Sequence, residues 1–291
     1  MSKLKLLVIG FLTGIVDAVP GISGATTLLV FGVYERTVSY ASTVIYDQIP
    51  KSFSNVFRLK SPENKLEFNK IAYLSVLLAG ILIGLVSSFV VFDRLLHISP
   101  SSVYGLFTGL ILGSSYIILN RNDEIKNRDN VKWMILGISI SAIIVLLSFT
   151  TGDSMLVLFV SGFIASFGML LPGLSGSFLL LILGKYSFVS GLIASLVDNP
   201  TAVLSNAGLQ ISIMGVGGVF GILVNLRLVS YLMDSNRETT LSAILGLVVG
   251  GLLAPVNEFM DLSNGDVILF SVFFLSSLLT TILIGYIKFE N

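Results

Sequence analysis

The residues that could do chemistry gather in a pentapeptide that occurs twice. Pro20-Gly21-Ile22-Ser23-Gly24 recurs 152 residues later as Pro172-Gly173-Leu174-Ser175-Gly176. Proline lacks a backbone donor and glycine permits non-helical turns, so each copy interrupts a helix that enters it. The freed backbone amides and nearby hydroxyls can close around an anion, which favours an anionic ligand over a metal cation. The candidate binding residues at the two breaks are Gly21, Ser23, Gly24, Thr26, Thr27, Gly173, Ser175, Gly176 and Ser177.

One carboxylate lies close to the first break. Asp17 stands three residues before Pro20 in an apolar stretch, and its counterpart in the second copy is Met169. A carboxylate within a membrane is costly and is therefore a candidate for function. We expect Asp17 to carry a coupling ion, a proton or sodium, or to pair with a basic group.

Two basic residues extend the candidate site. Arg227 stands in an otherwise apolar stretch, and its planar guanidinium suits phosphate or carboxylate. An arginine that reaches the cytoplasmic interface is an equally good interpretation. Lys185, beside Gly184, could receive an anionic headgroup on the outer side, and a simple interfacial lysine is the alternative.

Neither a metal nor a cofactor is expected. The chain has no cysteine and one histidine, His97, so thiolate sites and histidine clusters are excluded. The formal net charge is zero, with 17 basic and 17 acidic residues, so no nucleic-acid partner is indicated.

The chain reads as an integral membrane protein. Of its 291 residues 54% are apolar and 12% are charged, against about 25% charged in soluble domains. The mean hydropathy is +0.93. The polar residues of the repeated motif must therefore be positioned by elements that lie in a bilayer.

Each motif copy joins two apolar arms. The repeat includes flanking identities at Gly10, Phe11, Leu28, Leu29, Gly32 and Tyr34. As a helix, the first arm (6–19) spans about 21 Å, less than the roughly 30 Å core of a bilayer. Two such arms that meet at mid-depth predict a re-entrant hairpin, and paired half-helix ends near the midplane mark the substrate sites of transporters. A glycine kink in a packing helix is the alternative, and the duplication favours the site.

The remaining apolar segments complete two similar halves. Glycine pairs in the repeat, Gly80 and Gly84 with Gly217 and Gly221, predict close helix packing without a substrate role. The predicted fold is an all-α inverted repeat with a hairpin and three spans in each half. The first half (1–150) has its hairpin at 5–36 and spans at 71–92, 101–119 and 133–149, and the second half (151–291) has its hairpin at 155–191 and spans at 210–233, 239–255 and 267–287.

The numbers of lysine and arginine residues on the two sides of the membrane favour re-entrant hairpins. If both hairpins re-enter, 15 of the 17 basic residues lie on one side, and only Arg94 and Lys185 lie opposite. If each motif crosses once, the split is 6 to 11. The positive-inside rule prefers the first topology, which predicts a multi-pass plasma-membrane protein with both termini cytoplasmic.

The stretch from Gly14 to Thr26, the Pro-Gly-Leu-Ser-Gly copy and the six-span design resemble the polyprenyl-phosphate transporter family over nearly the whole chain. The resemblance implies a transporter rather than an enzyme. It implies a flippase that returns undecaprenyl or dolichyl phosphate from the outer to the cytoplasmic leaflet. Alternating access would then hold the phosphate at the two hairpin tips. The implied partners are this lipid and the bilayer, and no oligomeric state is predicted.

Two alternatives stay open. Membrane undecaprenyl-pyrophosphate phosphatases carry a related motif that continues with arginine and is joined by a glutamate-rich segment. Here Gly24 and Ala25 follow Ser23, no acidic cluster is visible, and Ser23 lacks an evident base. A small-anion transporter could use the same tips; a groove open to lipid would argue against it, and a closed aqueous vestibule would favour it.

Overall fold

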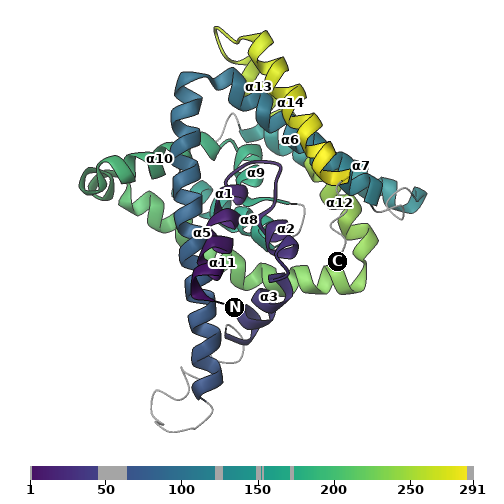
Figure 1. Ribbon diagram of the computed structural model, residues 1–291. Helices are drawn as coiled ribbons and strands as arrows, with labels where there is room; N and C mark the ends of the chain where they lie inside the picture. Colours follow the sequence, from purple (N-terminus) through teal and green to yellow (C-terminus); the bar gives the residue numbers. More distant parts are fainter. Residues whose placement is uncertain are drawn as a thin grey trace.

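The described part of the chain is entirely helical. The computed structural model describes residues 2–44, 64–121, 127–148, 152, 154–170 and 174–286, and within these ranges every regular element is a helix (Figure 1). Five of these helices are long and apolar enough to cross a membrane, or up to six if a bent pair counts as one span. The prediction of an all-α protein with several membrane spans is confirmed.

The helices follow one another in a similar order in the two halves of the chain. The first half contains α1 (Lys3–Asp17), α2 (Gly24–Val30), α3 (Tyr34–Ser42), α5 (Asn64–Ile98), α6 (Pro100–Arg121) and α7 (Arg128–Ser148). The second half contains α8 (Met155–Leu170), α9 (Gly176–Ile182), α10 (Tyr186–Asp198), α11 (Pro200–Ser235), α12 (Arg237–Gly250), α13 (Leu253–Met260) and α14 (Val267–Tyr286).

Each predicted second arm contains a further turn that the sequence analysis did not place. A glycine with positive φ stands two residues after the end of each short helix, Gly32 (+66°) after α2 and Gly184 (+64°) after α9. The N–H of Val33 bonds the carbonyl of Leu28 at 3.0 Å, and the N–H of Lys185 bonds that of Leu180 at 2.8 Å. This is the Schellman pattern, in which glycine accepts the left-handed conformation without steric cost. The chain then turns into α3 and α10, and α9 and α10 differ in direction by 119°.

Glycines bring the long helices together in pairs. α1 packs on α5, α8 on α11, α6 on α14 and α7 on α12. A methyl group on Gly84 would overlap the carbonyl oxygen of Phe11, and one on Gly217 would overlap that of Phe159. The predicted role of these glycines in close packing is therefore confirmed.

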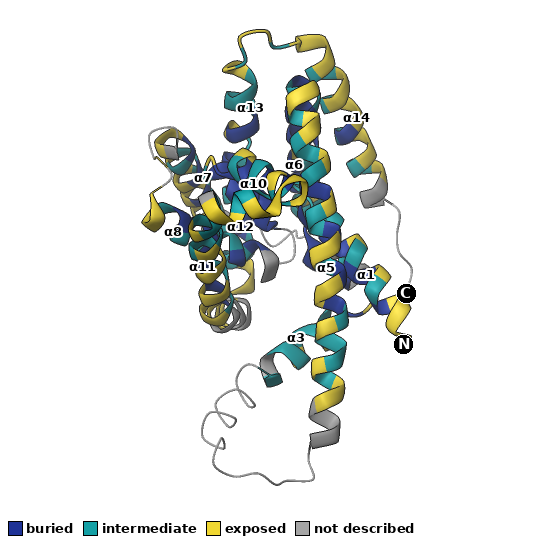
Figure 2. Cartoon of the chain, turned by 90° about the vertical axis from the view of Figure 1, so that its left-hand side faces the viewer, coloured by how far each residue is buried: buried dark blue, intermediate teal, exposed yellow. Residues whose placement is uncertain are grey.

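The core surrounds α9, which is buried over its whole length. Tyr186, the first residue of α10, belongs to this core, and the ring centroids of Phe107 and Phe89 lie 5.3 and 5.5 Å from that of Tyr186. Exposed residues run along the outer faces of α5, α11 and α14 (Figure 2), and many of them are apolar, such as Leu82, Val219 and Leu275. Apolar outer faces around a packed centre suit a lipid environment.

Candidate functional site

The two breaks meet inside the protein. The hydroxyl of Ser177 donates to the backbone carbonyl of Asp17 at 2.6 Å, and the hydroxyl of Tyr186 donates to that of Ala18 at 3.0 Å. Both acceptors lie at the C-terminal end of α1, where helix carbonyls have no partner within the helix. Side chains of the second copy therefore satisfy the broken backbone of the first.

The serines of the second copy form a directed chain of hydrogen bonds. Ser175 is the N-cap of α9 and accepts from the N–H of Phe178 at 3.1 Å. The hydroxyls of Ser175 and Ser177 lie 2.7 Å apart. Because Ser177 gives its single proton to the carbonyl of Asp17, Ser175 is the donor in this pair. Both hydroxyl protons are thus committed to acceptors within the protein in this conformation.

The carboxylate of Asp17 supports the first break. Its Oδ1 accepts from the N–H of Gly24, the first residue of α2, at 3.2 Å. Asp17 therefore ties the end of α1 to the start of α2, a role that the sequence analysis did not assign to it. Met169, its counterpart, has no oxygen that could act in this way.

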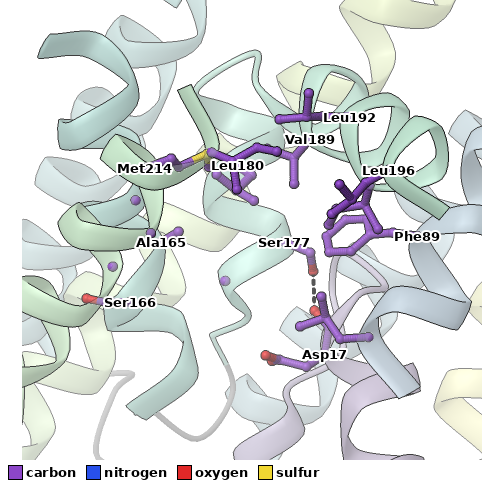
Figure 3. Close-up of a pocket in the computed structure, with 17 residues that line it drawn as sticks. Asp17, Phe89, Ala165, Ser166, Ser177, Leu180, Val189, Leu192, Leu196 and Met214 are labelled. Carbon is purple, nitrogen blue, oxygen red and sulfur yellow. Dashed lines mark hydrogen bonds between the residues drawn. The ribbon is translucent and has the colours of Figure 1, made fainter. Parts of the chain in front are cut away.

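A cavity of about 330 Å³ adjoins this contact and is partly open to the surface (Figure 3). Among the described residues that line it, the polar side chains are Asp17, Ser166 and Ser177, and Asp17 is the one ionisable residue. The other lining residues are glycine or apolar: Leu85, Phe89, Gly162, Ala165, Gly176, Leu180, Val189, Leu192, Ile193, Leu196, Ile211, Met214, Gly215 and Gly218.

The other candidates of the first break hold different positions. Gly21 has φ +97°, and a methyl group there would press on the backbone of Ile111 in α6 at 2.7 Å. Ser23 is buried, and Thr27 is half-buried on α2. The side chain of Thr26 lies outside what the structure describes, as does Gly173.

Lys185 is not brought to this contact. Lys185 is buried, and α9, seven residues long and so about 10 Å, separates it from Ser175. Its Nζ donates to the carbonyl of Gly152 at 3.4 Å, and it does not line the cavity. Arg227 lies on α11, and its side chain is outside the described part of the structure.

Two residues at the site were not predicted from the sequence. Tyr186 and Tyr34 are identical in the repeat, which was a usable signal for Tyr186. Asn225 is fully buried in α11 and donates to the hydroxyl of Ser166 at 2.6 Å, whereas its Oδ1 has no hydrogen-bond partner among the described residues. Among the described residues, no group of three or more acidic or histidine side chains could hold a metal ion.

Comparisons with known proteins give matches that cover most of the chain. Residues 13–264 match the profile of the VCA0040-like family, described as undecaprenyl phosphate translocase-like. A polyprenyl-phosphate transporter of Vibrio cholerae is 28% identical over 256 residues, which cover 87% of this chain and 77% of the relative. A polyprenyl-phosphate transporter of Staphylococcus aureus is 28% identical over 299 residues, which cover 97% of this chain and 96% of the relative. No solved structure matches significantly.

The family match thus includes both breaks and all residues that line the cavity. On this ground, the chain belongs to the VCA0040-like, undecaprenyl phosphate translocase-like family.

Proposed function

We propose that this protein transports a polyprenyl phosphate, undecaprenyl or dolichyl phosphate, from the outer to the cytoplasmic leaflet. The family and the names of both relatives support this substrate class. The observation that carries the proposal is the hydrogen-bonded meeting of the two breaks beside the cavity. Polar groups at a broken helix deep in a membrane protein are what an anionic headgroup requires to pass the hydrocarbon layer.

The packing supports an inverted repeat of residues 1–150 and 151–291. The α1–α5 pair of the first half corresponds to the α8–α11 pair of the second. In the repeat, α6 corresponds to α12 and α7 corresponds to α14. The α6–α14 pair therefore corresponds to the α12–α7 pair, and both pairs are in contact. Two halves that share a packing plan can rock against each other around a central site, which is the usual basis of alternating access.

Contacts between residues near helix ends support the re-entrant topology. Arg94 pairs with Asp198 at 3.5 Å, and Asn130 donates to Glu238 at 3.2 Å. With two re-entrant hairpins the partners of each pair lie on the same side of the membrane. If each motif crossed once, both pairs would join opposite sides. We therefore propose cytoplasmic termini in the plasma membrane.

The hydroxyls that now hold the first break are proposed to receive the phosphate. When the halves part, Ser177 and Tyr186 lose the carbonyl oxygens of Asp17 and Ala18 as acceptors. Phosphate oxygens are stronger acceptors and can replace them. Lys185 does not line the cavity, and Arg227 lies on α11. Both are proposed to meet the headgroup nearer the outer and cytoplasmic interfaces.

Asp17 is proposed to couple transport to an ion. A phosphate and an ionised carboxylate at one end of a cavity repel each other, and none of the described residues that line this cavity is cationic. A proton or a sodium ion at Asp17 removes that repulsion when the headgroup enters. Release of the ion on the other side would then favour release of the lipid.

The proposal is tested by headgroup accessibility in proteoliposomes that contain labelled polyprenyl phosphate. Ser177→Ala is expected to slow translocation by roughly threefold to tenfold, because one hydrogen bond to the headgroup is lost. Ser161→Ala is the matched control, since this buried serine bonds the Val157 carbonyl of its own helix at 2.7 Å. Wild-type protein that moves no lipid between leaflets would overturn the proposal. Phosphate release from the pyrophosphate form would redirect it to the phosphatase.

A further inference from the structure

We propose that the cavity beside the two breaks binds the isoprenoid chain of the lipid next to its phosphate. The inference rests in part on the proposed function, since it takes the lipid class from there. It adds a tail site, an orientation for the lipid and a position, Gly215, at which the chain can leave the protein.

The arrangement of polar groups gives the orientation. Asp17 and Ser177 lie together at one end of the cavity, and Leu192 and Val189 of α10 lie toward the other (Figure 3). A ligand that satisfies both ends has one polar terminus and an apolar body. The phosphate end of the lipid therefore faces the serine chain, and the isoprene units extend between α10 and α11.

The size and opening of the cavity fit part of a long chain. Its volume of about 330 Å³ is at the lower end of ligand cavities, which span roughly 300–1,000 Å³. The rest of a polyprenyl chain must therefore leave the protein. Gly215 lines the cavity and is itself exposed, and the adjacent Val216 and nearby Val219 are 60% and 62% exposed. The chain can leave here into lipid along an apolar surface.

The lining favours a branched chain. Gly215 and Gly218 on α11 leave part of one wall without side chains, whereas Gly162 on α8 lies against the backbone of α11 at Met214. A wall of this kind gives width, which the methyl branches of an isoprenoid require and a straight acyl chain does not. The apolar walls offer no hydrogen bonds to a free inorganic anion, so they also argue against a small-anion transporter.

Gly215 provides a direct test because its position is sterically open. A methyl group added there meets no atom within 4 Å, so Gly215→Leu adds an apolar side chain at the cavity wall without overlap at its Cβ. Replacing a helical glycine with leucine also favours the helix. Translocation of labelled polyprenyl phosphate is expected to slow about tenfold or more, the usual effect of steric misfit in an apolar pocket. Gly208→Leu, seven residues earlier on α11 and outside the cavity, is expected to leave the rate unchanged.

A second measurement locates the chain directly. Farnesyl phosphate with a photoreactive group on its first isoprene unit is cross-linked to the wild-type protein in liposomes, and the labelled peptides are identified by mass spectrometry. Labelling of α10 and α11 at the cavity, competed by farnesyl phosphate more than by oleyl phosphate, is expected. Equal competition would make the site one for any chain and overturn the isoprenoid assignment.

The two measurements separate the inference from the proposed function. Translocation by the wild type with unchanged rates in Gly215→Leu and labelling elsewhere would sink the tail site alone. Labelling of the cavity without translocation would support the tail site and overturn transport. Absence of both would overturn both.

Discussion

At the residue scale, Asp17 combines two tasks that a single substitution can separate. Its carboxylate binds the N–H of Gly24, and in the proposed cycle its charge must be neutralised before phosphate enters. Asp17→Asn keeps an oxygen that can accept the hydrogen bond and removes the charge. If the coupling ion is a proton, wild-type translocation falls as the pH rises on the loading side, because the ionised carboxylate repels the headgroup. The rate of Asp17→Asn is expected not to vary with pH.

The comparison with Asp17→Ala isolates the structural task. Alanine leaves the buried N–H of Gly24 without its acceptor, a loss of about 1–3 kcal/mol in the free energy of unfolding. Thermal unfolding in detergent is expected to show a lower Tm for Asp17→Ala than for Asp17→Asn. If Asp17→Asn retains the wild-type pH slope in the liposome assay, Asp17 is not the coupling residue. A sodium gradient in the same assay distinguishes the two ions.

The residue types of the motif predicted part of the site, but they did not predict the hydrogen-bond acceptors of its side chains. The duplicated pentapeptide and its flanks identified Asp17, Ser175 and Ser177, which the structure brings together. The acceptors of Ser177 and Tyr186 are backbone carbonyls 160 and 168 residues away. Every residue has such a carbonyl, so side-chain identities do not show which one is used. Lys185 was selected for its charge, and its Nζ instead bonds the carbonyl of Gly152.

At the scale of helices, two glycines on α11 differ in their surroundings, since one is packed against a neighbouring helix and the other is exposed. A methyl group on Gly217 would overlap the backbone of α8 at Phe159, and one on Gly215 would meet nothing. Gly217→Ala is expected to cost about 1–3 kcal/mol in the free energy of unfolding through overpacking. Gly215→Ala is expected to be neutral or to stabilise by up to about 1 kcal/mol through helix propensity. Thermal unfolding of both variants checks this pair, and equal Tm values would contradict the close α8–α11 contact.

Hydropathy located the long helices well and the short turns poorly. The predicted spans 71–92, 101–119 and 210–233 each lie within one helix, because an uninterrupted apolar run of that length has few other stable forms in a bilayer. The predicted span 239–255 is instead interrupted at Gly251 and Leu252, between α12 and α13. The turns at Gly32 and Gly184 were not placed, because a glycine in an apolar run serves equally as a packing residue. A positive φ depends on the helix end around it, which composition does not show.

At the scale of the whole molecule, the proposed topology can be mapped with single cysteines. The natural chain contains no cysteine, so labelling has no background. His97 and Asn199 lie at helix ends that the proposed topology puts outside, and Asn236 lies between α11 and α12 on the proposed cytoplasmic side. Cysteines at the first two positions are expected to react with an impermeant maleimide in intact cells, and one at Asn236 only after permeabilisation. Opposite labelling at His97 and Asn199 would contradict re-entry.

The bonds from α9 and α10 to the end of α1 also bear on how the protein rests between cycles. In the repeat, Tyr186 and Ala18 correspond to Tyr34 and Leu170, so an exchange of conformations between the halves can replace one tyrosine bond with another. Ser177 corresponds to Ala25, which has no hydroxyl, so its bond to Asp17 has no equivalent after the exchange. One hydrogen bond is worth roughly 1 kcal/mol, or about a fivefold ratio of populations. By this difference alone, the lipid-free transporter is mainly in the conformation described here. Ser177→Ala shifts the equilibrium toward the conformation that opens to the other side of the membrane.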